Sequence, residues 1–117
     1  MSALVEPWLI DQGATFVRSI KLRDSNDAAV NLTGYSARLQ VRRGPAAPDP
    51  ALVTLTSPTG GITLDSSGVI TVTFSAAVTS AMAFETGAFD LLLTAPDGSK
   101  RRLIQGQVQV SPAVTRG

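Results

Sequence analysis

Apolar and polar side chains alternate along much of this chain, most regularly between residues 35 and 42. One face of an extended segment would carry Tyr35, Ala37, Leu39 and Val41, and the other would carry Ser36, Arg38, Gln40 and Arg42. A period of two is typical of a β-strand with one buried side. We therefore predict a strand that follows a turn at Gly34, with one face in the core and the other toward water or a partner.

The same alternation, interrupted by turn-forming residues, predicts further strands at residues 14–23, 51–57, 62–64, 69–74, 88–94 and 101–110. Ser75 is placed as an N-cap before an alanine-rich stretch, which predicts one short helical turn near residues 76–82. The proline-rich stretch 43–50 is typical of an exposed loop. Seven to eight short strands indicate an all-β fold, an immunoglobulin-like antiparallel β-sandwich, with a small barrel as the alternative.

We predict that the chain divides into an N-terminal arm at residues 1–13, a sandwich domain at 14–110 and a C-terminal tail at 111–117. The arm contains Trp8, the only tryptophan, and Ile10. These two side chains either tuck against the edge of the domain, as large apolar side chains tend to do, or belong to an arm that docks on a neighbouring subunit. In the last predicted strand, Gly106 falls on the inward side and indicates a bulge or a close backbone approach.

Composition narrows the classes of function. A chain of 117 residues with 44% apolar and 16% charged residues suits one folded domain. The net charge of +1 does not point to nucleic acid. Because the chain has neither cysteine nor histidine, disulfides, the usual zinc ligands and the commonest general base are excluded. We expect no secretory signal and no membrane insertion, since no apolar run approaches the length of a transmembrane helix.

Carboxylates are the first enzymatic possibility, because a glycosidase needs two acids across a cleft. The candidates each have an ordinary structural explanation, in a turn, beside a glycine or on an outward strand face: Asp65, Glu85, Asp90 and Asp97. The turn at residues 24–27 lacks the ligand spacing of a calcium loop. We therefore predict a non-enzymatic protein with no catalytic, cofactor-binding or metal-binding residues.

Surface residues provide the remaining candidates. The basic clusters at residues 42–43 and 100–102 suit solubilised strand ends better than a phosphate or nucleic-acid patch, because no aromatic residues interleave with them. Three glutamines of the last strand form an uncharged outer face, which is either simply solvated or a contact surface within an assembly. The candidate interaction residues are Trp8, Ile10, Arg42, Arg43, Arg101, Gln105, Gln107, Gln109, Val114 and Arg116.

Six segments spread over nearly the whole chain combine turns with strand alternation: residues 8–16, 30–42, 61–64, 87–91, 97–98 and 102–108. Together they resemble small structural proteins of tailed bacteriophages and prophages, in particular the immunoglobulin-like N-terminal domain of phage baseplate upper proteins. Such proteins usually continue into a helical or receptor-binding-protein-holding region, whereas this chain stops after the first domain. That difference favours a stand-alone adaptor or decoration subunit.

The resemblance implies a virion protein, made in the bacterial host cytoplasm and present in several symmetric copies. Its partners would be other virion proteins of the tail, baseplate or capsid, with no specific nucleic acid. We expect a tail or baseplate adaptor or fibre-attachment module that uses exposed strand edges, the Trp8 arm and the C-terminal tail as contacts. A capsid decoration protein and a host-surface carbohydrate-binding module are the alternatives, the latter needing an exposed aromatic platform.

Overall fold

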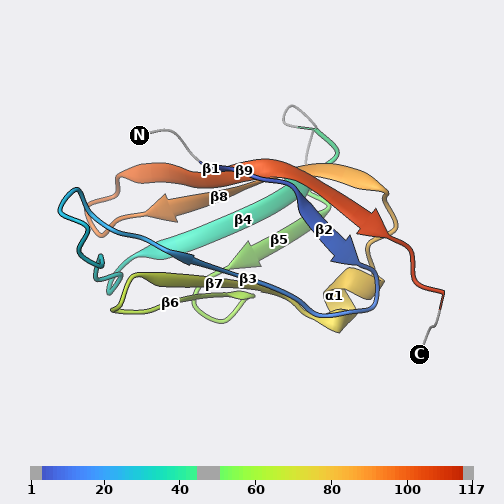
Figure 1. The fold of residues 1–117 in the computed structure, drawn as a ribbon, viewed down its shortest axis with the longest axis horizontal. Coiled ribbons are helices and arrows are strands. Elements are labelled where there is room, and N and C mark those ends of the chain that lie inside the picture. Colours follow the sequence, from blue (N-terminus) through green and yellow to red (C-terminus); the bar gives the residue numbers. More distant parts are fainter. Residues whose placement is uncertain (1–3, 45–50, 115–117) are drawn as a thin grey trace.

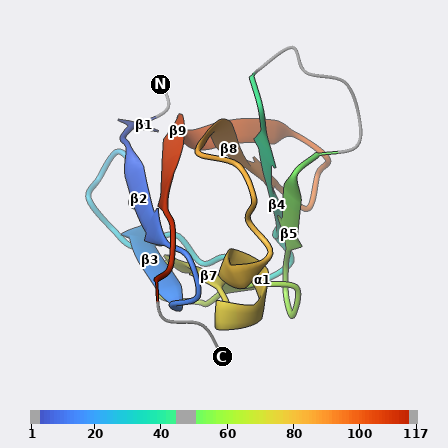
Figure 2. The ribbon, with the colours of Figure 1, turned by 90° about the vertical axis from the view of Figure 1, so that its right-hand side faces the viewer.

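The computed structural model describes residues 4–44 and 51–114, and these residues form two sheets packed face to face (Figures 1 and 2). The larger sheet has the order β1-β9-β8-β4-β5, and β2 also pairs with β9. The smaller sheet has the order β3-β7-β6. The predicted all-β sandwich is thereby confirmed.

The strands of the larger sheet are β1 (Leu4–Val5), β2 (Trp8–Asp11), β4 (Ser36–Arg42), β5 (Val53–Thr56), β8 (Thr86–Thr94) and β9 (Lys100–Ser111). Those of the smaller sheet are β3 (Phe16–Lys21), β6 (Ile62–Leu64) and β7 (Val69–Phe74). The described residues thus hold nine strands and not seven or eight, because the N-terminal segment contributes two.

The core lies between the sheets, where the inward residues predicted from the alternation meet. Leu39, Val72 and Leu91 are completely buried, and Phe16 packs against them from the edge. The alternation in β4, with Ala37, Leu39 and Val41 buried, is as predicted. A sheet with one face on the core and the other in solvent has this pattern, because successive side chains point to opposite faces.

The structure corrects the prediction of a separate N-terminal arm, because strands β1 and β2 of that segment belong to the larger sheet. Strands β1 and β2 pair in parallel with β9, and one register runs through both: Leu4 lies beside Ile104 and Trp8 beside Val108. The backbone of Glu6 passes between them so close to Gly106 that a Cβ atom there would collide with the Glu6 carbonyl. Of the two interpretations of Gly106, the close backbone approach is therefore confirmed.

A bulge occurs elsewhere in β9. Leu91 of β8 pairs with Ile104 and Leu92 pairs with Arg102, so Leu103 is an extra residue in β9. Both Leu103 and Ile104 are buried, which strict alternation does not predict. The extra residue of a bulge interrupts the alternation of inward and outward side chains along its strand. Here, two consecutive apolar residues of β9 therefore point to the core.

The short helix α1 (Ala76–Ser80) connects β7 to β8 and lies at one end of the sandwich (Figure 2). As predicted, Ser75 is its N-cap, and the Ser75 hydroxyl accepts a hydrogen bond of 3.2 Å from the Val78 amide. Thr79 is completely buried; its hydroxyl donates to the Ala14 carbonyl at 2.8 Å and accepts from the Gly13 amide at 3.0 Å. The helix therefore holds the turn that connects β2 to β3.

Candidate interaction surface

The outer face of the larger sheet brings together three of the predicted interaction residues and an apolar row. Gln105, Gln107 and Gln109 lie on the solvent side of β9, as predicted, and Gln107 and Gln109 are exposed. Val5 is in register with Gln105 and Leu9 with Gln109, and Pro7 lies between them. Because strand partners in register share a face, an apolar row runs beside the amide row. We call these six residues the N-terminal strip: Val5, Pro7, Leu9, Gln105, Gln107 and Gln109.

The apolar row is unusually exposed. Val5 is 73% and Leu9 69% accessible, and Leu4 on the same strand pair is 55% accessible. Only two other large hydrophobic side chains in the described part of the chain are exposed, Val17 on β3 and Val114 after β9. The exposed apolar surface is therefore concentrated on β1, β2 and the two residues between them, which we call together the N-terminal strand. Contact with another protein would remove this surface from water.

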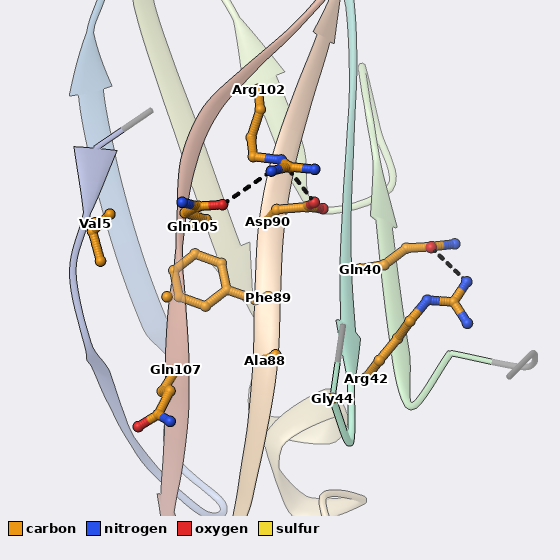
Figure 3. A pocket seen from close by; sticks show the side chains of 11 residues that line it. Val5, Gln40, Arg42, Gly44, Ala88, Phe89, Asp90, Arg102, Gln105 and Gln107 are labelled. Atoms are coloured by element: carbon orange, nitrogen blue, oxygen red, sulfur yellow. Dashed lines mark hydrogen bonds and ion pairs between the residues drawn. The ribbon is translucent and has the colours of Figure 1, made fainter. Parts of the chain in front are cut away.

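Beside the strip the sheet face is hollowed into a depression of about 470 Å³ (Figure 3). Its floor includes the small side chain of Ala88, and Val5, Gln105 and Gln107 form the wall that it shares with the strip. Arg42, another predicted residue, lines the opposite side and donates a hydrogen bond of 2.9 Å to Gln40. The depression thus joins residues of β1, β4, β8 and β9.

Two of the charged side chains that line this depression form an ion pair. The Arg102 guanidinium lies 3.2 Å from the Asp90 carboxylate and donates a further hydrogen bond of 3.1 Å to the Gln105 amide oxygen. Asp90 therefore lies on an outward face, as predicted, and has an ordinary ion-pair partner.

The inward side of the N-terminal strand contains a polar cluster that sequence reasoning missed. Glu6 accepts hydrogen bonds from the indole of Trp8 at 2.7 Å and from Arg18 Nε at 2.7 Å and Nη2 at 3.0 Å. The hydrogen bond with Arg18 holds the pKa of the Glu6 carboxyl below its usual value. Since Glu6 belongs to the larger sheet and Arg18 to the smaller, the pair links the two layers at one side of the sandwich.

A signal for this cluster was present in the sequence. Arg18 shares the inward face of β3 with Phe16 and Ile20, and a cation between apolar residues calls for a nearby acceptor. Nothing local indicates which carboxylate supplies it, because Glu6 and Arg18 belong to different sheets. Only the folded arrangement identifies the partner.

Trp8 and Ile10 were predicted interaction residues, and the structure corrects that role. Trp8 is 2% accessible and Ile10 is completely buried. The Trp8 ring stacks on Phe89 with centroids 3.9 Å apart and packs edge-on against Phe74. The interpretation in which both side chains tuck into their own domain is therefore the one observed, and three of the large aromatic rings are unavailable as a carbohydrate-stacking platform.

The strand edges next to Trp8 offer little room for an added strand. The backbone amides of Glu6 and Gln12 donate hydrogen bonds to carbonyls of β9. The odd-numbered residues between them therefore direct their backbone groups to the open edge of the sheet. One of these residues is Pro7, which has no N–H to offer an added strand. On the neighbouring edge, the Arg18 side chain donates to the Ser19 carbonyl. Since proline and side-chain cover discourage strand addition, the expectation that exposed strand edges supply the contacts is not supported on this side, and the sheet face is the better candidate.

The remaining predicted residues are dispersed. Arg43 is exposed next to the depression, and Arg101 is exposed on β9 opposite Leu93. Val114 is 96% accessible and lies beyond β9, while Arg116 lies outside the described residues. The structure therefore gathers Arg42, Gln105 and Gln107 at one depression but does not bring Arg101 or Val114 to it.

The other candidate carboxylates do not converge. Asp65 and Asp97 accept hydrogen bonds from backbone amides within their own turns. The hydrogen bonds from Ser99 lower the pKa of Asp97. Among residues 4–44 and 51–114, no group of acidic side chains is arranged to hold a metal ion. No helix in the same residues is long and apolar enough to span a membrane.

Comparison with known proteins adds no family. No protein-family model matches this chain, and no curated protein matches it significantly. Its class therefore stands on the structure alone: an all-β sandwich with an exposed apolar and amide strip on the larger sheet.

Proposed function

We propose that this chain is a non-enzymatic structural protein of a tailed-bacteriophage virion, acting as a tail or baseplate adaptor or fibre-attachment module through protein–protein contacts. The observation that carries the docking part of the proposal is the N-terminal strip, where Val5 and Leu9 are mostly exposed beside an uncharged amide row. The phage assignment rests on the resemblance of the sequence segments.

The strip has the composition that protein interfaces favour. Its apolar side chains gain free energy when a partner excludes water, roughly 25 cal/mol for each Å² of apolar surface removed. Its amides form hydrogen bonds without the desolvation cost of a buried charge. The surface is also held rigidly, because Trp8 and Ile10 on the reverse side of the same strand are buried in the core. A preorganised surface loses less entropy on binding.

Analysis of purified particles tests the assignment. Phage particles would be induced from the bacterium that encodes the chain, purified by density gradient and separated into heads and tails, and each fraction quantified by mass spectrometry. We expect the chain in the tail fraction in several copies per particle. Recovery with heads alone would favour a capsid decoration protein. Absence from both fractions, with the chain abundant in the lysate, would refute a virion role.

A second experiment tests the strip. Particles assembled with Leu9→Glu should contain less of the chain, whereas Val17→Glu should leave incorporation unchanged. Val17 is a suitable control because it is also an exposed aliphatic residue, at 56%, on an edge strand of the other sheet. Equal incorporation of the two variants would show that docking occurs elsewhere.

A further inference from the structure

We propose that the outer face of the larger sheet binds an acidic surface of a partner protein, with carboxylates of the partner set against arginine and lysine side chains that lie beside the N-terminal strip. The inference rests on the proposed docking function and names the chemistry of the partner. It follows from where strand register places the cations, and from the exposed apolar row next to them.

Strand register gathers basic side chains on the outer face of β4, β8 and β9. Arg38 of β4 and Arg102 of β9 are each in register with Leu92 of β8, so the two arginines flank this leucine. Lys100 is in register with Thr94, the next outward residue of β8. Strand partners in register share a face of the sheet. We call the four basic side chains of this face the basic patch: Arg38, Arg42, Lys100 and Arg102.

The basic patch outweighs the acidic side chains around it. Asp90 is the one acidic residue at the outward positions of these three strands, which lie entirely within the described residues, and it is paired with Arg102 at 3.2 Å. Arg38 and Lys100 are exposed, and neither forms an ion pair with another described residue. On the larger sheet, the outward Asp11 of β2 lies at the far end, beside the last residue of β9.

The charge of the molecule is therefore unevenly distributed. The outer face of β4, β8 and β9 carries four basic side chains and one acidic side chain, a formal charge of +3, whereas the whole chain carries +1. The remainder of the chain is net negative. Such a distribution creates a directional field, which attracts and orients a partner that has a negative surface.

The apolar row beside the patch selects among acidic ligands. Val5 and Leu9 are mostly exposed, and Leu92 is partly exposed between two arginines. A nucleic acid or an acidic polysaccharide supplies anions but little that would cover aliphatic side chains. Single-stranded nucleic acid also stacks on exposed aromatic rings, and the rings of Trp8 and Phe89 on this sheet are buried. A protein surface supplies carboxylates and apolar side chains together, as interfaces commonly do.

The depression of about 470 Å³ connects the patch to the strip. Arg42 and Arg102 line it, and Gln105 and Gln107 belong to the wall shared with the strip (Figure 3). A guanidinium presents N–H groups in a fork that matches a carboxylate, and a glutamine amide offers two further N–H donors. A partner carboxylate in the depression would therefore meet donors from both β4 and β9, while its apolar neighbours lie against Val5.

Binding to a synthetic polypeptide tests the charge requirement. The probe is a fluorescently labelled random copolymer of glutamate and tyrosine, titrated with the whole chain and followed by fluorescence anisotropy. We expect saturable binding at low ionic strength that weakens as salt is added, since salt screens charges at a surface. Arg38→Glu and Lys100→Glu should each reduce the association constant at least about tenfold, and Arg38→Gln should reduce it less.

Lys21→Glu is the matched control for the charge reversals. Lys21 is exposed on β3 of the smaller sheet, and its replacement changes the net charge by the same amount as Arg38→Glu or Lys100→Glu. We expect this variant to bind the copolymer nearly as well as the wild type. No binding by the wild type, or equal losses in Lys21→Glu and in the two face variants, all folded by circular dichroism, would overturn the proposal.

A second set of titrations tests whether the partner is a protein. Leu9→Ser should weaken binding of the copolymer but not of polyglutamate, which has no apolar side chains, and Val17→Ser should change neither. Labelled oligothymidylate and polygalacturonate present anions without apolar side chains, and we expect each to bind at least about tenfold more weakly than the copolymer. Equal or tighter binding of either would overturn the assignment to a protein partner.

The two proposals fail in different ways. Copolymer binding that requires Arg38 and Leu9, in a chain that is absent from phage particles, would refute the virion role and leave the acidic-partner inference standing. Incorporation into tails that is unchanged by Arg38→Glu, together with no binding to the copolymer, would refute the inference and leave the proposed function standing.

Discussion

Replacement of Glu6 by glutamine tests whether the polar cluster at the N-terminal strand holds the two layers together. Glu6 accepts three hydrogen bonds, from Trp8 and from two nitrogens of Arg18, at 2.7–3.0 Å. A hydrogen bond to a charged group contributes about 1.5–3 kcal/mol when it is shielded from solvent. Here the side chains of Glu6 and Arg18 are 27% and 36% accessible, and solvent screening reduces the contribution. We expect Glu6→Gln to lower the free energy of unfolding by about 1–2 kcal/mol at neutral pH.

The pH dependence gives this prediction a specific signature. The folded state lowers the pKa of Glu6, so its contribution to stability is present above the unfolded pKa of about 4.3 and is lost as the pH falls through the folded pKa. The difference in stability between the wild type and Glu6→Gln should therefore be largest near pH 7 and should diminish in acid. Other carboxylates, including Asp97, are the same in both proteins and cancel in the comparison.

The chain provides its own reporter for this measurement. Trp8 is the only tryptophan, is 2% accessible and donates directly to Glu6, so its fluorescence should change when the cluster separates. Urea titrations followed by Trp8 emission, at several pH values between about 3 and 7, would give the stability difference. Glu85→Gln is the control, because it removes an exposed carboxylate. A Glu6→Gln stability loss that does not change with pH, or that matches the loss in the control, would refute the reasoning.

Three further substitutions probe the N-terminal strand and the helix. Trp8→Ala should destabilise the fold by about 3–5 kcal/mol in urea titrations followed by circular dichroism, since it empties a buried aromatic site; a loss below 1 kcal/mol would contradict its core position. Gly106→Ala should cost about 1–3 kcal/mol because the new methyl group meets the Glu6 carbonyl, whereas Gly44→Ala, with open space around it, should cost far less; equal melting temperatures would contradict the close approach. Ser75→Ala should cost about 1 kcal/mol by removal of the N-cap, measured as a fall in melting temperature, and an unchanged temperature would show that the cap contributes little.

Much of the fold could be predicted because strand alternation is a local property. The buried faces of β4, β7 and β8 follow directly from side chains that recur every second residue, and the N-cap of α1 is visible as Ser75 before alanines. The outward amide row of β9 was found in the same way. These features depend on a few neighbouring residues, so they can be predicted without knowledge of the partner strand.

The role of the N-terminal segment was not predictable, because it depends on contacts across about a hundred residues. Its alternation is short and is interrupted by Pro7. Because Leu9 is apolar but points outward between the buried Trp8 and Ile10, the sequence does not indicate which face is buried. Trp8 therefore suited an interacting arm as well as a core residue, until parallel pairing with β9 decided between them. The extra residue Leu103 was missed for a related reason, since a bulge is defined only by the strand opposite it.

The sequence by itself determined that this chain makes strands, which faces of most strands are apolar, and that cysteine and histidine chemistry is absent, because these follow from residue identity and local spacing. The tertiary structure decided which strands are neighbours. It placed Val5 and Leu9 beside the glutamines of β9 and Glu6 against Arg18 in the other sheet. Such contacts are set by the packing of segments distant in the chain, and the proposed interaction surface exists only through them.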